Sequence, residues 1–172
     1  MKFEIPQIHH DSMFKAYQQE CKDNHETWIH GAGGLRVDDD YFDWLKRDIQ
    51  VREGHEIPNG YVQATTYFVI EDDTMIGTIN IRHSLNEMLL LSGGNIGYSV
   101  LPSRRRQGIA TKILQFGKEF CFQLGMKEIL VICHKNNIAS KKTIERCGGV
   151  LENEVVIDHE TLLRYWIKGE EK

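Results

Sequence analysis

The sequence lacks the features that would place it among membrane, secreted or multidomain proteins. No apolar run approaches the ~20 residues of a membrane helix, and the first residues contain no signal-peptide apolar region. We therefore expect no membrane association and a cytoplasmic protein. No internal repeat, low-complexity tract or domain linker is present. Residues 1–172 are accordingly predicted to form a single domain with one core.

Cysteine pairs and excess positive charge are also missing. The cysteines at 21, 121, 133 and 147 form no C-x-x-C pair, which argues against a structural zinc site, and we expect no metal. Free thiols suit a reducing compartment. Lysine and arginine number 21 against 25 aspartate and glutamate residues, a net charge of -4. This balance argues against nucleic acid as a partner, and the arginine run at 104–106 is too short to reverse it.

Residues 97–112 are the most informative stretch that is present. A short apolar strand runs into a proline, three arginines and a turn in which Gly108 and Ala110 open a helix. The first backbone N–H groups of a helix lack partners and attract anions. A larger side chain at Gly108 or Ala110 would block the backbone, and Arg105 and Arg106 would add charged contacts. The pattern predicts a phosphate-binding turn; the alternative is an ordinary loop with a solvated basic run.

The remaining pattern predicts alternating helices and strands. Four helices are expected. The first is capped by Asp11 and ends near residue 24, the second begins after residues 38–40, and the others cover residues 107–124 and 137–147. Strands are expected over 1–5, 62–70, 75–82, 95–101, 127–133, 150–157 and 162–167. Strands 62–70 and 75–82 should form an antiparallel hairpin, and 95–101 and 127–133 should lie side by side and parallel. Connections are expected over 27–36 and 51–61, and residues 83–92 should form a loop or a short helix packed on the core.

Two blocks of the sequence resemble the signature of the GNAT superfamily of N-acetyltransferases. The first is residues 100–102 followed by 105–110, and the second, about thirty residues later, is residues 137–140 followed by 144–148. The resemblance implies an α/β (α+β) GNAT fold, with a central mixed twisted β-sheet of about six to seven strands flanked by about four helices. It also implies direct transfer of an acetyl group from acetyl-coenzyme A to a primary amine in a ternary complex.

By the same resemblance, acetyl-coenzyme A lies along the strand and the turn, and no metal is needed. Backbone groups of the strand pair with the pantetheine arm, and an N–H near Val100 faces the thioester oxygen. The pyrophosphate lies on the turn, and Asn137 bonds the arm from the other side unless it only caps a helix. The implied cofactor-binding residues are Ser99, Val100, Leu101, Arg105, Arg106, Gln107, Gly108, Ala110, Thr111 and Asn137.

The catalytic residues are less well defined, because the chain departs from the family at the general acid. Many members have a tyrosine four residues after the position of Ser140, and this chain has Ile144 there. Ser140 is then a candidate general acid. The alternatives are that Ser140 is a helix-surface serine without a catalytic role, or that the thiolate leaves without a general acid.

For the general base the sequence offers four candidates without choosing among them. They are His83, His134, Glu152 and Glu154.

The acceptor is not identified by the sequence beyond a small-molecule or peptide amine. We expect it to approach between the glycine-rich segment 27–36 and residues 83–94, with the aspartates at 38–40 steering a cation or simply beginning a helix. The runs 80–86 and 148–155 resemble a bacterial branch of predicted acetyltransferases, which implies no particular acceptor. A monomer or homodimer is expected.

Functions of other classes remain as alternatives. A noncatalytic acyl-coenzyme A binding or sensor domain would keep the anion turn and lose the chemistry. A nucleotide-binding domain is disfavoured, because residues 108–111 lack the Gly-Lys-Ser/Thr ending of a P-loop and the three glycines of a dinucleotide fingerprint.

Overall fold

The computed structural model describes residues 1–169 and follows the predicted order of elements. Its strands are β1 (Lys2–Glu4), β2 (Trp28–Ile29), β3 (Leu35–Arg36), β4 (Ala64–Glu71), β5 (Thr74–Arg82), β6 (Ile96–Val100), β7 (Glu128–His134), β8 (Val150–Ile157) and β9 (Glu160–Lys168). Its helices are α1 (Asp11–Asp23), α2 (Tyr41–Glu53), α3 (Ile109–Gln123) and α4 (Ile138–Arg146), with the shorter η1 (Ile8–His10), η2 (Leu89–Gly93) and η3 (Pro102–Arg104).

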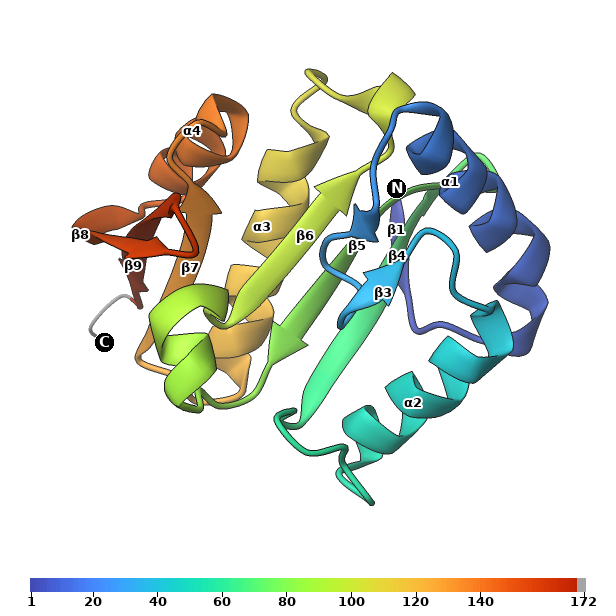
Figure 1. The fold of residues 1–172 in the computed structure, drawn as a ribbon, viewed down its shortest axis with the longest axis horizontal. Coiled ribbons are helices and arrows are strands. Elements are labelled where there is room, and N and C mark those ends of the chain that lie inside the picture. Colours follow the sequence, from blue (N-terminus) through green and yellow to red (C-terminus); the bar gives the residue numbers. More distant parts are fainter. Residues whose placement is uncertain (170–172) are drawn as a thin grey trace.

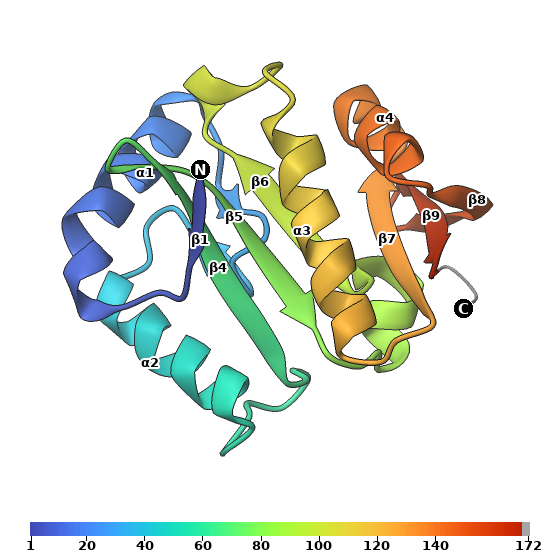
Figure 2. The same ribbon diagram turned by 180° about the vertical axis from the view of Figure 1, so that it is seen from behind.

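The strands form a central sheet in two parts, and the predicted α/β fold class is confirmed. The first part has the order β1-β4-β5-β6 and the second β7-β9-β8, with every ladder antiparallel. The two-residue strands β2 and β3 pair with each other inside the glycine-rich segment that was predicted to be a loop. β6 and β7 lie side by side and run in the same direction (Figures 1 and 2), as predicted.

Alternate residues of β4 face two different hydrophobic clusters, because successive side chains of a strand point to opposite faces. Val69 belongs to the cluster that includes α3, whereas Phe68 and Ile70 belong to the cluster of α1 and α2. The helices therefore cover both faces of the first sheet: α3 lies behind β6 in Figure 1 and in front of it in Figure 2. Aromatic rings of Phe14 and Trp44 stack on Phe68 at centroid distances of 5.6 and 5.7 Å.

The beginnings of α1 and α2 differ from each other. Asp11 is the first residue of α1, not its cap as predicted; His10 stands at the N-cap and forms no side-chain cap bond. Asp40 does cap α2, because its side chain accepts the N–H groups of Phe42 and Asp43 at 2.9 and 3.0 Å.

The other aspartates of residues 38–40 also have local partners. Asp39 accepts the N–H of Arg36 at 2.9 Å, and Asp38 lies 2.6 Å from the ammonium of Lys22. These contacts favour the alternative that residues 38–40 simply begin a helix over the one in which they steer a cation.

The connection predicted over 51–61 is shorter than expected, because α2 continues to Glu53 before Gly54 ends it with a φ of 74°. Val51 extends the buried face of the helix, which explains the extra turn.

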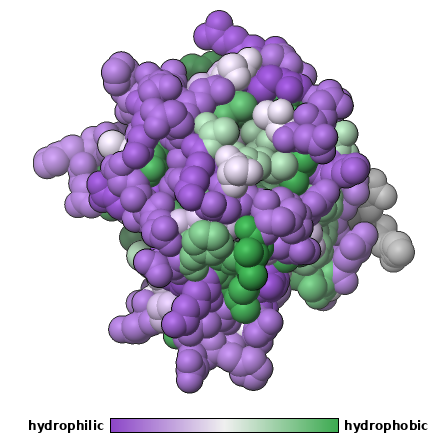
Figure 3. Space-filling view, turned by 90° about the vertical axis from the view of Figure 1, so that its right-hand side faces the viewer, coloured by the Kyte–Doolittle hydropathy of each residue, from purple (hydrophilic) through white to green (hydrophobic). Residues whose placement is uncertain are grey.

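The outer surface over α1 and α2 is polar. Figure 3 looks onto the side of the molecule where these helices lie, and hydrophobic atoms gather there only in small areas between hydrophilic ones. Within residues 1–169, no helix combines the length and the apolar character needed to cross a membrane.

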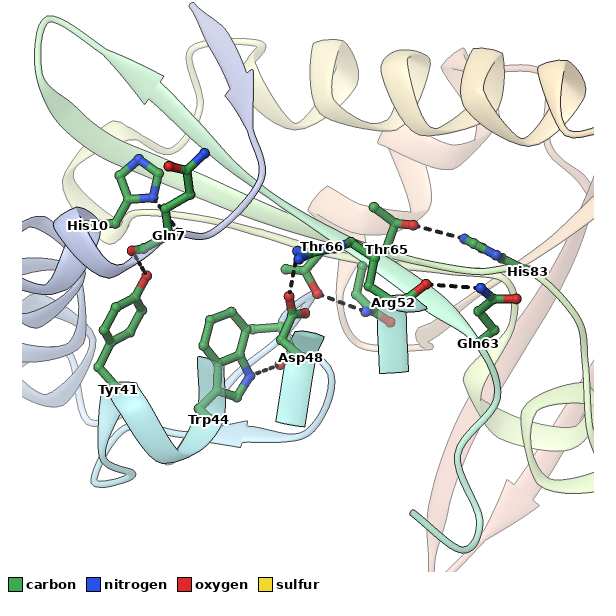
Figure 4. Close-up of polar contacts among 12 residues, drawn as sticks. Gln7, His10, Tyr41, Trp44, Asp48, Arg52, Gln63, Thr65, Thr66 and His83 are labelled. Atoms are coloured by element: carbon green, nitrogen blue, oxygen red, sulfur yellow. Dashed lines mark hydrogen bonds and ion pairs between the residues drawn. The ribbon is translucent and has the colours of Figure 1, made fainter. Parts of the chain in front are cut away.

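A carboxylate is buried between α2 and the first sheet. Asp48 is 7% exposed and points toward β4, with Arg52 Nη1 3.4 Å from its Oδ2 (Figure 4). Burial raises the pKa of Asp48 to about 6, against the opposing effects of a hydrogen bond with Thr66 and the charge of Arg52. The folded protein therefore holds this proton more tightly than the unfolded chain does.

Replacing Asp48 should consequently stabilise the protein in a pH-dependent way. A folded-state pKa above the unfolded value of 3.8 means that stability is lost as the pH rises from about 4 through about 6. At roughly 1.4 kcal/mol per pKa unit, Asp48→Asn should gain up to about 3 kcal/mol over the parent across that window and nothing further above it. Urea unfolding at several pH values measures this. Glu53→Gln, an exposed change on the same helix, is the control; a gain independent of pH would contradict the prediction.

Candidate active site

The predicted anion turn lies between β6 and α3. Gly108 is the N-cap of α3, with a φ of 75° and no side-chain cap bond, so the first N–H groups of α3 lack intrahelical partners. A Cβ added to Gly108 would meet no atom within 4 Å. Arg106 is exposed and also has a positive φ, 63°, a conformation that non-glycine residues rarely adopt. The turn thus leaves open space in front of unpaired backbone donors.

The arginines beside this turn have different environments. Arg105 donates to the carbonyl of Val100 at 3.0 Å and to Glu26 at 2.6 Å, which ties the turn to the segment after α1. Arg104 pairs with Glu71 at the end of β4. Arg106 makes no ion pair among the described residues and is the arginine free to meet an incoming anion.

The other predicted cofactor-binding residues surround the same turn. Gln107 is exposed and accepts a bond from Arg104 at 3.4 Å, while Ala110 and Thr111 lie half-buried in the first turn of α3. The hydroxyl of Ser99 faces α1, 2.9 Å from that of Tyr17. Ser99 therefore presents to the turn side only its backbone.

β6 has a free backbone edge that faces β7. The Leu101 N–H bonds to the Ile76 carbonyl and the Asn95 carbonyl accepts the Arg82 N–H, so odd-numbered residues of this stretch point toward β5. Tyr98 and Val100 then point their N–H groups the other way. Among the described residues no ladder joins β6 to β7. The N–H of Val100, predicted to face the thioester oxygen, is thus directed into the space between the two strands.

A tyrosine missed by the sequence analysis lies in this space. The Tyr98 hydroxyl on β6 is 2.8 Å from the hydroxyl of Ser140 on α4. Burial raises the pKa of Tyr98 to about 12, against a lowering by the Ser140 hydrogen bond, so the phenol keeps its proton. Ile144 is fully buried in the core and cannot reach a ligand. Tyr98 comes from another element, and only its alternation along β6 could have indicated where it points.

Asn137 caps α4, since its side chain accepts the N–H of Ser140 at 3.1 Å. The capping role that the sequence analysis kept as an alternative is therefore present. Asn137 is exposed, and its amide nitrogen forms no hydrogen bond with the described residues.

The glycine-rich segment brings a second missed residue, His30, close to β6. A Cβ on Gly31 would lie 2.5 Å from the Cα of Tyr98, so this loop packs directly on the β6 backbone. The Gly31 carbonyl accepts the hydroxyl of Thr78 at 2.8 Å, which holds it there. His30 is exposed to solvent, yet neighbouring protein atoms lower its pKa; Glu26 raises that pKa, and His134 and Arg105 lower it further. His30 thus lies within electrostatic range of Arg105, which follows β6, and of His134, which ends β7.

The predicted base candidates are not all brought together. His134 ends β7, exposed, with Nδ1 3.4 Å from Glu160. His83 lies elsewhere, because it follows β5, and the end of β5 pairs with the start of β6 at Asn95. Asn95 is five residues before Val100 in an extended strand, so His83 lies about 17 Å from Val100. Its imidazole bonds Thr65 at 2.9 Å. This position disfavours His83 as a base acting beside Val100, because antiparallel pairing puts the ends of β5 and β6 at opposite ends of the sheet.

The two glutamates named as further bases also lie away from the opening. Glu152 pairs with Arg164 at 2.5 Å and Glu154 with Lys135 at 2.9 Å. Both belong to β8, which β9 separates from β7. Each carboxylate is thus engaged in an ion pair at the far edge of the second sheet.

The family follows from a comparison with known domains. Residues 6–150 match the model described as the acetyltransferase (GNAT) domain. The chain belongs to the GNAT family of acetyltransferases. No curated protein matches the chain in sequence.

Solved structures of GNAT proteins share the fold at low sequence identity. A spermidine N-acetyltransferase from Vibrio cholerae is 13% identical over 98% of this chain and 95% of its own, with a TM-score of 0.64. An acetyltransferase from Salmonella typhimurium that modifies the N-terminal serine of a ribosomal subunit protein is 16% identical over 98% and 94%, at 0.69. A microcin self-immunity acetyltransferase in complex with acetyl-CoA and AMP is 16% identical over 96% and 91%, at 0.69.

The turn at Gly108 and the space between β6 and β7 together have the chemistry of a site for an acyl carrier with a pyrophosphate. Backbone N–H groups and Arg106 suit the phosphates, and Gly108 leaves them room. The outward N–H groups of Tyr98 and Val100 and the C=O of Tyr98 suit an amide-containing arm such as pantetheine, while the Val100 carbonyl already accepts a bond from Arg105. The residues present therefore fit such a carrier.

One group of side chains within residues 1–169 has the spacing of a metal site: Glu4, His9 and His10. His10 Nδ1 accepts the N–H of Gln7 at 3.1 Å, so its proton is on Nε2, 3.3 Å from Glu4. A metal would need the lone pair of that same Nε2. We assign no metal to this group, which links β1 to the start of α1 by hydrogen bonds.

Proposed function

We propose that this GNAT protein is an acetyl-coenzyme A dependent N-acetyltransferase that moves the acetyl group directly to a primary amine in a ternary complex. One observation carries the proposal: the unpaired N–H of Val100 lies on one strand between the phosphate-type turn and the Tyr98–Ser140 hydroxyl pair. The pyrophosphate, the pantetheine arm and the sulfur of the donor would meet these three features in that order.

In this proposal the turn and β6 hold the donor. The N–H groups of Gly108, Ala110 and Thr111, with the side chains of Arg106 and Gln107, bind the pyrophosphate. Backbone groups of residues 99–101 pair with the arm, and the free amide of Asn137 bonds it from α4. Arg105 orients the turn through its bonds to Val100 and Glu26, and so acts on the phosphates from behind.

The chemistry needs no metal and no covalent enzyme intermediate. The neutral amine attacks the thioester carbon, and the Val100 N–H donates to the oxygen as it gains negative charge. The nitrogen gives one proton to a base, the C–S bond breaks, and the sulfur leaves as a thiolate. Ser140 donates a hydrogen bond to that sulfur and Tyr98 donates to Ser140, so the pair stabilises the leaving charge without losing its own proton.

His30 is the base in this proposal. Its lowered pKa leaves it neutral at pH 7, and its loop packs on Tyr98, beside the carbonyl-binding Val100. His134, which is exposed like His30, lies 3.4 Å from Glu160 and lowers the pKa of His30.

The acceptor is a small-molecule or peptide amine. The amine acceptors named for the Vibrio and Salmonella structures, spermidine and a protein N-terminus, support this class without choosing between them. The noncatalytic alternative is disfavoured, because a sensor domain has no use for His30 and a Tyr98–Ser140 pair directed at the sulfur.

Acetyl-coenzyme A should stabilise the fold through the turn. At about 100 times Kd the gain is roughly 2.7 kcal/mol, or about 5 to 10 °C in Tm for a chain of this size. Gly108→Ala should lose most of this shift in differential scanning fluorimetry, since its methyl would enter the phosphate space. Gly125→Ala is the matched control, because Gly125 also has a positive φ and open surroundings. Equal shifts in the two variants would refute the site.

Removing either hydroxyl of the pair should slow turnover. A hydrogen bond to a charged group contributes about 1.5–3 kcal/mol, so Tyr98→Phe and Ser140→Ala should each lower kcat by roughly 10- to 100-fold with little change in donor affinity. The double variant should be no slower than the slower single one, because the two hydroxyls act as a chain. Thiol release with an amine panel gives kcat; additive losses would mean independent roles. A parent that shows the Tm shift but releases no thiol is the noncatalytic binding domain.

His30→Gln should remove one of two ionisations from the acidic limb of the pH profile of kcat/KM. In the parent the rate falls as the acceptor amine becomes protonated, and it falls more steeply below about pH 6.5, because the pKa of His30 lies under that value and its protonated form cannot accept a proton. His55→Gln, an exposed histidine change, should leave the profile unaltered. A parent-like profile in His30→Gln would exclude it as the base.

A further inference from the structure

A pocket opens on the face of the first sheet that carries α2. It has about 750 Å³ of space including its mouth, and it lies between Gly33–Gly34 of the glycine-rich segment and η2. These are the two segments between which the sequence analysis expected the acceptor to approach. Its walls are mostly apolar, from Trp44, Val51, Tyr61, Val62, Met88 and Leu89.

Arg47, at the wall of this pocket, has a buried nitrogen without a partner. Its Nη2 is shielded from solvent and makes no hydrogen bond with any described residue. An unpaired buried donor costs free energy, and a charged one costs more, so such groups usually mark a missing acceptor.

Arg82 adds a second cation that lacks a carboxylate. Its Nη1 donates to the carbonyls of Gly93 and Gly94 at 3.0 and 3.3 Å, and no acidic group among the described residues pairs with it. Burial lowers its pKa to about 10, as expected for a guanidinium whose charge is not neutralised.

Asp48 is the acidic residue of the lining, and it is already engaged. Its carboxylate is turned toward Arg52 and β4 (Figure 4), and the charge of Arg47 also lowers the pKa of Asp48 without a hydrogen bond between the two side chains. The lining thus holds two arginines against one aspartate, so its uncompensated charge is positive.

We propose that this pocket binds the acceptor, and that the acceptor is an amine with an apolar body and a carboxylate that pairs with Arg47. The inference rests on the proposed function. A carboxylate matches the planar guanidinium through two parallel hydrogen bonds. A phosphate dianion fits less well, because Asp48 would repel its second charge in these apolar surroundings.

The strand register sets the length of such an acceptor. A Cβ on Gly97 would lie 3.3 Å from Arg82 Nη2, so the Arg82 end of the pocket lies beside Gly97. Val100 is three residues further along β6, about 10 Å away. A peptide residue spans about 3.5 Å, so an acceptor that extends from the Arg82 end of the pocket to Val100 has about the length of a tripeptide or of a long ω-amino acid. An α-amino acid is too short.

Binding in the absence of acetyl-coenzyme A tests the pocket separately from catalysis. Calorimetry would compare alanyl-alanyl-leucine with its C-terminal amide, and 8-aminooctanoic acid with octylamine. The parent should bind each acid about 10- to 100-fold more tightly than its counterpart without a carboxylate, and Arg47→Gln should remove that preference while binding the counterparts as before. Lys46→Gln, which removes an exposed charge from the same helix, should keep it.

Asp48→Asn changes binding in the opposite direction and guards against a general loss of structure. It removes a like charge, so it should tighten acid binding while Arg47→Gln weakens it. A parent that binds acids and counterparts equally, or binds none of them, overturns the proposal, as does a preference that survives Arg47→Gln. Arg47-dependent binding without thiol release would support the acid-binding pocket and contradict the proposed acetyl transfer. Acetylation indifferent to the carboxylate would overturn the pocket alone.

Discussion

The buried side chain of Asn95 determines how the two parts of the sheet meet. Its backbone N–H donates to the Leu130 carbonyl at 2.7 Å, and its Oδ1 accepts the Leu130 N–H at 2.8 Å. Its amide nitrogen reaches back to the Arg82 carbonyl at 3.3 Å. These bonds fasten β6 to β7 at the start of β6, beyond which no ladder forms between them. A ladder would have occupied the outward N–H of Val100, so the candidate site depends on this short connection.

Glycine makes the other side of the site. Gly31 lets a loop touch the backbone of Tyr98, where any side chain would collide, and Gly97 leaves room for the guanidinium of Arg82. The first contact carries His30 toward the strand ends, and the second shapes the pocket behind α2. Both faces of β6 are thereby used: the Tyr98–Ser140 pair lies on one face, and the glycine-rich segment and the pocket lie on the other.

The departure from the GNAT pattern at Ile144 has a structural counterpart. A buried isoleucine strengthens the core under α4, while Tyr98 supplies a phenol from the neighbouring strand to the same serine. In the proposed mechanism the hydroxyl near the leaving sulfur can therefore come from either element, since what matters is its distance from the reacting atoms and not its place in the sequence.

The sequence by itself determined the order of the elements, the α/β class and the turn at Gly108, because periodicity, glycine and helix ends are local properties. It also indicated Ser140 and the two segments that line the pocket. It could not exclude His83, since antiparallel pairing alone moves the end of β5 away from that of β6. Tyr98, His30 and the unpaired Arg47 have no local signal: their positions follow from strand register, from close backbone packing and from burial. Those properties exist only once distant segments are packed together, and they decided which side chains meet at the site.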